Sequence, residues 1–148
     1  MKKVVLLFLC TIFGFAAEWY PMGCKAKIFE IFIDTKSIKR VNEETIEAWY
    51  KDLYNKPSVV GDIKNVKYVL YKKTCNHSIR NCVISEMHYY NASGLPIFSY
   101  AEELTSTVVP DSVGECVVDG LKFMETGVYQ MGREPSEIFV LKKDKQRK

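Results

Sequence analysis

The chain has 148 residues, 47% of them hydrophobic and 26% charged, which is typical of one globular domain rather than a disordered segment. Its formal net charge is +3, and loss of Lys2 and Lys3 with an N-terminal leader leaves about +1. A charge so close to neutral gives no electrostatic case for nucleic acid, which would need a clustered basic face, so we expect no nucleic-acid partner.

The N-terminus has the pattern of a secretory signal peptide. The positive segment Met1–Lys3 precedes an uncharged apolar run at 4–15, and small residues allow cleavage after Ala16 or Ala17. The run is shorter than the about 20 residues of a membrane-spanning helix. We therefore predict a signal peptide over 1–17, export, and a mature chain without a transmembrane segment.

The next segments are predicted to be short strands. Glu18–Lys25 can form a first strand, and Ile28–Asp34 is a stronger one because it is rich in Ile and Phe. The polar cluster Thr35–Ser37 predicts a turn, with Asp34 capping it.

The segment Asn42–Tyr54 fits two templates. Its apolar residues fall at helical spacing, whereas positions 45–50 also alternate as a strand would. The spacing alone favours a helix, through Ile46, Trp49, Tyr50 and Leu53.

A meander of antiparallel strands is predicted next. Asn55–Asp62 contains Pro57 and Gly61 and reads as a loop. Two alternating segments, Val66–Cys75 and Cys82–Tyr90, then form a hairpin. After a turn at 91–94, Leu95–Tyr100 returns as another strand, which makes the pairing antiparallel.

The C-terminal part is predicted to be helical. Ser112 and Glu115 have the spacing of a capping box, which marks a helix start. An apolar stripe follows that can pack on a sheet: Val113, Cys116, Val117, Gly120, Leu121 and Met124. Glu137–Leu141 is a candidate short strand, and the basic end of the chain is expected to be a solvated tail.

Four cysteines remain after the leader, with Cys10, is removed: Cys24, Cys75, Cys82 and Cys116. An even number in an exported chain predicts disulfides, with three possible full pairings. Cys75, His77 and Cys82 match no common zinc spacing, so we expect no metal site.

No catalytic or cofactor motif accompanies the two histidines, His77 in a predicted turn and His88 in a predicted strand. Ser37 and Ser112 stand where hydroxyls serve the backbone. We predict no enzyme, no catalytic residue and no cofactor. Tyrosines on the strands can form a binding face, but ordinary sheet packing explains them more simply: Tyr68, Tyr71, Tyr89, Tyr90 and Tyr100.

The order of several short motifs resembles that of the surface-adhesin protein E family, which comprises small exported domains of Gram-negative bacteria. The similarity runs from about Trp19 to Leu121, although two family features, an aromatic near Thr105 and a cysteine near Lys122, are missing. The motifs are Trp19, the sequence FIDTKSI at 32–38, Trp49-Tyr50-Lys51, Thr74-Cys75, Tyr89-Tyr90 ahead of Gly94, and VPDSVGE at 109–115.

The resemblance implies an α+β fold, an antiparallel meander sheet with the C-terminal helix packed on one face. It places Trp49 on a strand, against the helical spacing, and we follow it there. It also implies the pairing Cys75–Cys116, which leaves Cys24 with Cys82. The rival pairing is Cys75–Cys82 across the hairpin with Cys24–Cys116, and the sequence leaves both open.

These observations together predict a signal peptide at 1–17, a protein E-like domain at 18–127 and an extension with a basic tail at 128–148. By resemblance, the protein is an adhesin-like, non-enzymatic binding protein of a Gram-negative bacterium. It would bind a host or envelope protein, and it would itself be located in the periplasm or at the outer cell surface. The alternative is a periplasmic structural or envelope-associated protein.

Overall fold

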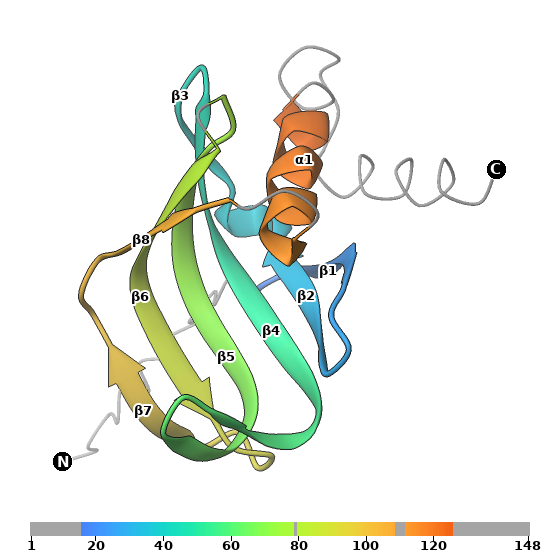
Figure 1. Ribbon diagram of the computed structural model, residues 1–148, viewed down its shortest axis with the longest axis vertical. Helices are drawn as coiled ribbons and strands as arrows, with labels where there is room; N and C mark the ends of the chain where they lie inside the picture. Colours follow the sequence, from blue (N-terminus) through green and yellow to red (C-terminus); the bar gives the residue numbers. More distant parts are fainter. Residues whose placement is uncertain (1–15, 79, 109–111, 126–148) are drawn as a thin grey trace, which may run out of the picture.

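The computed structural model describes residues 16–78, 80–108 and 112–125. The apolar run of the predicted signal peptide, the predicted strand Glu137–Leu141 and the extension at 128–148 lie outside these residues. The described part contains an eight-stranded antiparallel sheet and one α-helix (Figure 1). The predicted α+β class, a meander sheet with a C-terminal helix, is therefore confirmed.

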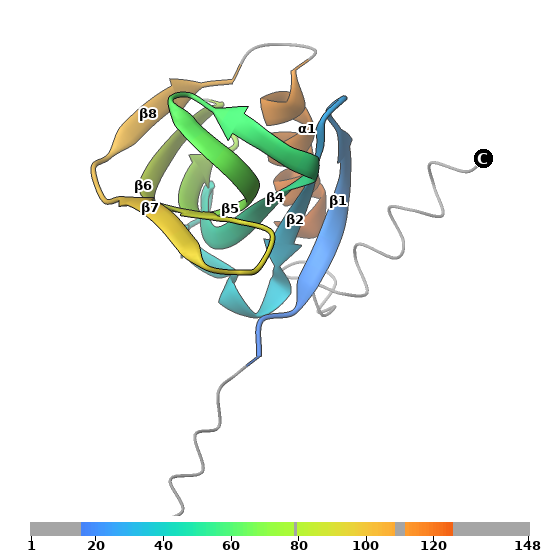
Figure 2. The same cartoon turned by 90° about the horizontal axis from the view of Figure 1, so that it is seen from below.

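The sheet has the strand order β1-β2-β4-β5-β6-β7, while β3 also pairs with β4 and β8 with β6. It curls around an interior, and α1 lies against the concave side next to β1 and β2 (Figure 2). The elements are β1 (Trp19–Lys25), β2 (Phe29–Asp34), the 3₁₀ turn η1 (Thr35–Ser37), β3 (Lys39–Asn42), β4 (Thr45–Val60), β5 (Ile63–Asn76), β6 (Asn81–Tyr90), β7 (Pro96–Tyr100), β8 (Leu104–Thr107) and α1 (Val113–Glu125).

The helix favoured by the spacing within 42–54 is wrong, because this segment forms the first half of β4. Ile46, Ala48 and Tyr50 are each at most 1% exposed, and the residues between them face the other side of the sheet. This period of two arises because β4 lies between β2 and β5 in the interior of the sheet. The resemblance, which placed Trp49 on a strand, predicted the segment correctly.

The loop predicted at 55–62 is also wrong, since β4 continues to Val60 and β5 begins at Ile63. Pro57 falls in an irregular stretch between Leu53 and Ser58, where the register shifts and no ladder N–H is required. The chain reverses at Gly61, whose φ of 58° is the left-handed conformation that glycine adopts without strain. The result is a long hairpin rather than two strands joined by a loop.

Two strands were not predicted, β3 and β8. Every residue of both strands is exposed, so neither has the alternation of buried and exposed residues that marks a strand in a sequence. They form because a neighbour offers a free edge: β8 pairs with the first half of β6, and β7 pairs with the second half.

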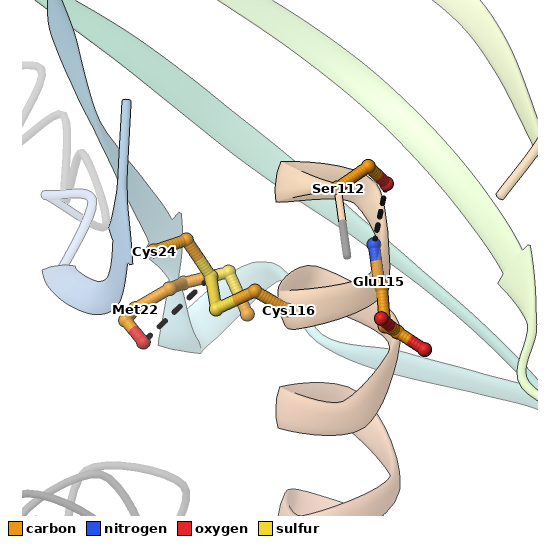
Figure 3. The surroundings of a disulfide bond; sticks show 5 residues. All are labelled: Met22, Cys24, Ser112, Glu115 and Cys116. Atoms are coloured by element: carbon orange, nitrogen blue, oxygen red, sulfur yellow. Dashed lines mark hydrogen bonds between the residues drawn. A yellow bond between two sulfur atoms is a disulfide. The ribbon is translucent and has the colours of Figure 1, made fainter. Parts of the chain in front are cut away.

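The helix α1 begins as the capping pattern predicts. The backbone N–H of Glu115 donates to Oγ of Ser112 at 3.2 Å (Figure 3), and the Glu115 carboxylate pairs with Arg80 in the turn before β6. Val117, Val118 and Leu121 are each 1% exposed, so the inner side of the helix completes the core. Burying side chains of this size stabilises the fold by roughly 1.5–3 kcal/mol each.

The cysteines pair as Cys24–Cys116 and Cys75–Cys82. The pairing implied by the resemblance is thus wrong, and the rival is correct. Cys75 and Cys82 are direct cross-strand partners with their Cα atoms 4.1 Å apart, so the hairpin brings them together. Cys116 lies near the start of α1, which packs beside β1, and there it meets Cys24 (Figure 3).

Candidate functional site

The alternation along the strands divides the aromatic side chains between two faces of the sheet. Of the tyrosines considered as a binding face, Tyr71 and Tyr89 point inward and are 7% and 8% exposed. Tyr68 and Tyr90 are half-buried on the opposite side, where their rings stack with centroids 4.7 Å apart. The tyrosines therefore do not form one surface, and each face requires its own description.

The convex side, which we call the outer face, carries a half-buried aromatic surface. The indole of Trp49 stacks on the His88 ring at 5.9 Å. Nζ of Lys51 lies 4.5 Å from the ring centre of Trp19 and 5.0 Å from that of Phe32. The outer face comprises Trp19, Phe32, Trp49, Lys51, Leu53, Tyr68, Leu70, Lys72, His88 and Tyr90, all of which are partly exposed.

The helix does not cover this face, because α1 lies on the concave side of the sheet (Figures 1 and 2). Within the part of the chain that the structure describes, no other element packs over it. Aromatic pairs across strands stabilise a sheet, which accounts for some of this composition. A row of partly exposed aromatic rings is also the composition that is enriched at protein interfaces.

His88 has polar neighbours that sequence reasoning missed. Its Nδ1 lies 2.9 Å from Oγ of Ser99, and its Nε2 lies 3.6 Å from a carboxylate oxygen of Glu86. Ser99 reaches this position because it is the register partner of His88 on β7. The sequence contained no signal for it, since the contact depends on strand pairing. The side chains of His88 and Glu86 are 31% and 41% exposed, so solvent screens this cluster.

The other sequence-predicted polar residues serve the backbone, as expected. Oγ of Ser37 donates to the carbonyl of Asp34 and accepts from the N–H of Trp49, both at 2.8 Å. Oδ1 of Asp34 accepts from the N–H groups of Lys36 at 3.2 Å and Glu18 at 2.9 Å. His77 lies in the turn after β5, and its N–H donates to the carbonyl of Glu44.

A cavity of about 240 Å³ opens on the concave side of the sheet, the inner face. Its wall is mainly apolar and comes from β2, β4, β5, β6 and the first turns of α1. Three polar side chains, those of Asp52, Tyr71 and Lys73, interrupt it. The apolar lining consists of Phe29, Ile31, Tyr54, Val60, Val69, Ile84, Met87, Tyr89, Val113, Gly114 and Val117.

The three polar side chains interact within this apolar surround. The hydroxyl of Tyr71 donates to Oδ1 of Asp52 at 2.9 Å. Burial raises the pKa of Asp52 to about 6, although the Tyr71 hydrogen bond and the charge of Lys73 act in the opposite direction. Burial also lowers the pKa of Lys73. Both charged groups keep part of their surface exposed to the cavity.

Metal ligation has no candidate among the described residues, where no three His, Cys, Asp or Glu side chains come together. Cys75 and Cys82, considered above as metal ligands, are bonded to each other. In the same part of the chain, no helix is both long and apolar enough to cross a bilayer.

Comparison with known proteins identifies a structural likeness only. No protein-family model and no curated protein matches the chain. Among solved structures, protein E from non-typeable Haemophilus influenzae aligns over 76% of this chain and 78% of its own, with 14% identity and a TM-score of 0.52. The selenomethionine form of H. influenzae protein E aligns over 68% and 82%, with 16% identity and a TM-score of 0.49. The first of these alignments shows that the chain has a protein E-like fold.

Proposed function

We propose that this chain is an exported, adhesin-like binding module that contacts a protein partner through the outer face. The observation that carries the proposal is the continuous row of half-buried aromatic and aliphatic side chains across β2, β4, β5 and β6. Tyr and Trp provide much of the binding energy at protein interfaces, because they bury large areas with few rotatable bonds. The protein E-like fold and the motif resemblance support the same role.

The partner's chemistry follows from the composition of this face. Its centre is apolar, at Leu53, Leu70 and the Tyr68–Tyr90 stack, while charges of both signs lie farther along the same strands. Lys72 pairs with Glu47 at 3.5 Å, so these charges are partly compensated within the chain. We expect a protein surface with an apolar centre and a mixed polar rim, rather than a nucleic acid or a strongly charged ligand.

Site-specific photo-crosslinking in cells tests the contact surface. A photoreactive residue at Leu70, in the middle of the outer face, should give a discrete adduct with one partner. The same residue at Lys64, which is exposed near the tip of the β4–β5 hairpin, is the control and should give none. The substitution Trp49→Ala should remove the Leu70 adduct. Equal adducts from both positions, or none from Leu70, would rule out the outer face as the contact surface.

The compartment is a further part of the proposal. Two disulfides indicate an oxidising, extracytoplasmic environment, because cytosolic thiols are kept reduced. We place the domain at the outer cell surface of a Gram-negative bacterium, with the periplasm as the alternative for an envelope-associated structural protein. Protease added to intact cells should digest the domain if it is at the surface. Protection until the outer membrane is permeabilised would support the periplasmic alternative.

We propose binding rather than catalysis, and the cluster at His88 is the place to test this. A serine, a histidine and a carboxylate in contact are the components of a hydrolase site. Here they lie on an open strand surface, and none of them lines the cavity. Ester hydrolysis by the purified protein should stay at background and be unchanged in Ser99→Ala and His88→Ala. A turnover that both substitutions abolish would show that the protein is an enzyme.

A further inference from the structure

The inner-face cavity combines the size of a small-molecule site with apolar walls. A cavity of about 150 Å³ is enough to hold a benzene molecule. The cavity here is about 240 Å³, so it accommodates one ring or a branched aliphatic chain together with a small polar head. Its walls come from four strands and the helix, so its shape is set by rigid elements rather than by loops.

Lys73 is a cation in this cavity that is influenced by the charge of Asp52 but has no direct protein partner among the described residues. Among the described residues its Nζ has neither a hydrogen bond nor an ion pair, and it lies beyond ion-pair distance of Asp52. Its neighbours on the same side of β5 are Tyr71 and Cys75, which are buried in the core. Packing therefore gives no reason for a lysine at this position. An ammonium group held against apolar side chains without a direct hydrogen bond or ion pair is unfavourable, which points to an anionic group supplied by a ligand.

Asp52 provides the opposite charge in the same cavity. One carboxylate oxygen accepts the Tyr71 hydrogen bond, which fixes the orientation of the group. An ionised carboxylate has about four acceptor positions, so Asp52 retains capacity for a second donor. The cavity thus presents an anchored anion and a cation that attract each other without a direct ion pair between them.

We propose that this cavity binds a small zwitterion with an apolar body, the class of the free hydrophobic amino acids. The ligand's carboxylate pairs with Lys73, its ammonium group pairs with Asp52, and its side chain fills the apolar part near Val69, Ile84 and Met87. A singly charged ligand satisfies one of the two protein charges and brings a like charge toward the other, so the site discriminates against it. The inference concerns the inner face and is independent of the proposed contact on the outer face.

Calorimetric titration of the exported protein, with both disulfides formed, tests the proposal with L-phenylalanine and L-leucine. Phenethylamine lacks the carboxylate and 3-phenylpropionate lacks the ammonium group, so each should bind at least about tenfold more weakly than L-phenylalanine. Lys73→Met and Asp52→Asn should weaken amino-acid binding by a similar factor. Lys72→Met is the matched control, because Lys72 is the next residue of β5 but faces outward, and it should leave binding unchanged.

Methyl NMR locates the ligand independently of these variants. Addition of L-leucine should shift the methyl signals of Ile84 and Val69, which line the cavity, and leave those of Leu70 on the outer face unchanged. The absence of saturable binding at millimolar concentrations would overturn the proposal. Equally tight binding of the two single-charge comparators, or an equal loss in Lys72→Met, would also overturn it.

Discussion

Reduction of the two disulfides one at a time should destabilise the domain by unequal amounts. Cys24 and Cys116 are separated by 92 residues along the chain, whereas Cys75 and Cys82 are separated by 7. In the chain-entropy account, a cross-link stabilises the fold by restricting the unfolded chain, and the restriction increases with the logarithm of loop length. This relation gives about 4.6 kcal/mol for the long loop and about 2.4 kcal/mol for the short one at 25 °C.

The assay compares each bond with its own reduced form. The variant Cys75→Ala/Cys82→Ala retains only the long-range bond, and Cys24→Ala/Cys116→Ala retains only the hairpin bond. The free energy of unfolding is measured in urea for each variant with and without reductant. Because packing is nearly the same on both sides of each comparison, the difference reports the bond itself. Peptide mapping without reductant should first confirm the single linked pair in each variant.

We expect reduction to destabilise the first variant by about 2 kcal/mol more than the second. If reduction unfolds the first variant completely while the second stays folded, the order is the same. An equal effect of reduction on both, or a larger effect on the hairpin bond, would refute the reasoning. In that case, loop length would not explain how the Cys24–Cys116 disulfide stabilises the fold.

Three further changes test individual groups. Asp52→Asn should remove a pH dependence of the free energy of unfolding. Burial raises the pKa of Asp52 from 3.8 to about 6 in the folded protein, so the carboxyl stabilises the fold fully below pH 3.8. This stabilisation, at most about 3 kcal/mol, is lost as the pH rises through 6. Urea unfolding of both proteins at pH 4 and pH 7 measures this difference. The same change in the free energy of unfolding between the two pH values in both proteins would contradict the prediction. Ser37→Ala should lower the free energy of unfolding by about 1–2 kcal/mol, because the N–H of Trp49 loses its acceptor. Ser106→Ala, at an exposed position of β8, is the control. Ser112→Ala should cost about 1 kcal/mol through the lost cap on Glu115, and no change in unfolding would exclude a capping role.

The central strands and the helix were predictable from local composition and capping. Val66–Cys75 and Cys82–Tyr90 are rich in β-branched and aromatic residues, and both form paired strands, although a register shift between Lys72 and Lys73 interrupts their alternation. The capping pattern at Ser112 similarly located the start of α1. By contrast, Trp49 and its neighbours matched two periods at once, and only the position of β4 between two strands decides between them. The exposed strand β8 could not be predicted from the sequence, because it forms only by pairing with the edge of β6.

The two faces of the sheet could not be predicted in the same way. Alternation places Lys73 opposite Lys72, but sequence does not say which of two adjacent lysines points into the curved interior. That depends on the direction in which the sheet curls and on where α1 packs. The contact between His88 and Ser99 likewise depends on the register of β6 with β7. The disulfide pairing depends on α1 lying beside β1, which no local pattern indicates.

The position of Asp34 distinguishes between the two cleavage sites that the sequence predicts for the signal peptide. Oδ1 of Asp34, a residue only 9% exposed, lies 2.9 Å from the backbone nitrogen of Glu18. Cleavage after Ala17 would convert that nitrogen from a neutral amide into an α-ammonium group, and the contact would become an ion pair with a hydrogen bond about twice as strong. Cleavage after Ala16 would leave the amide neutral and place the new charge on Ala17, which is exposed to solvent. Of the two predicted cleavage products, only the one that begins at Glu18 would have its N-terminus anchored by the fold.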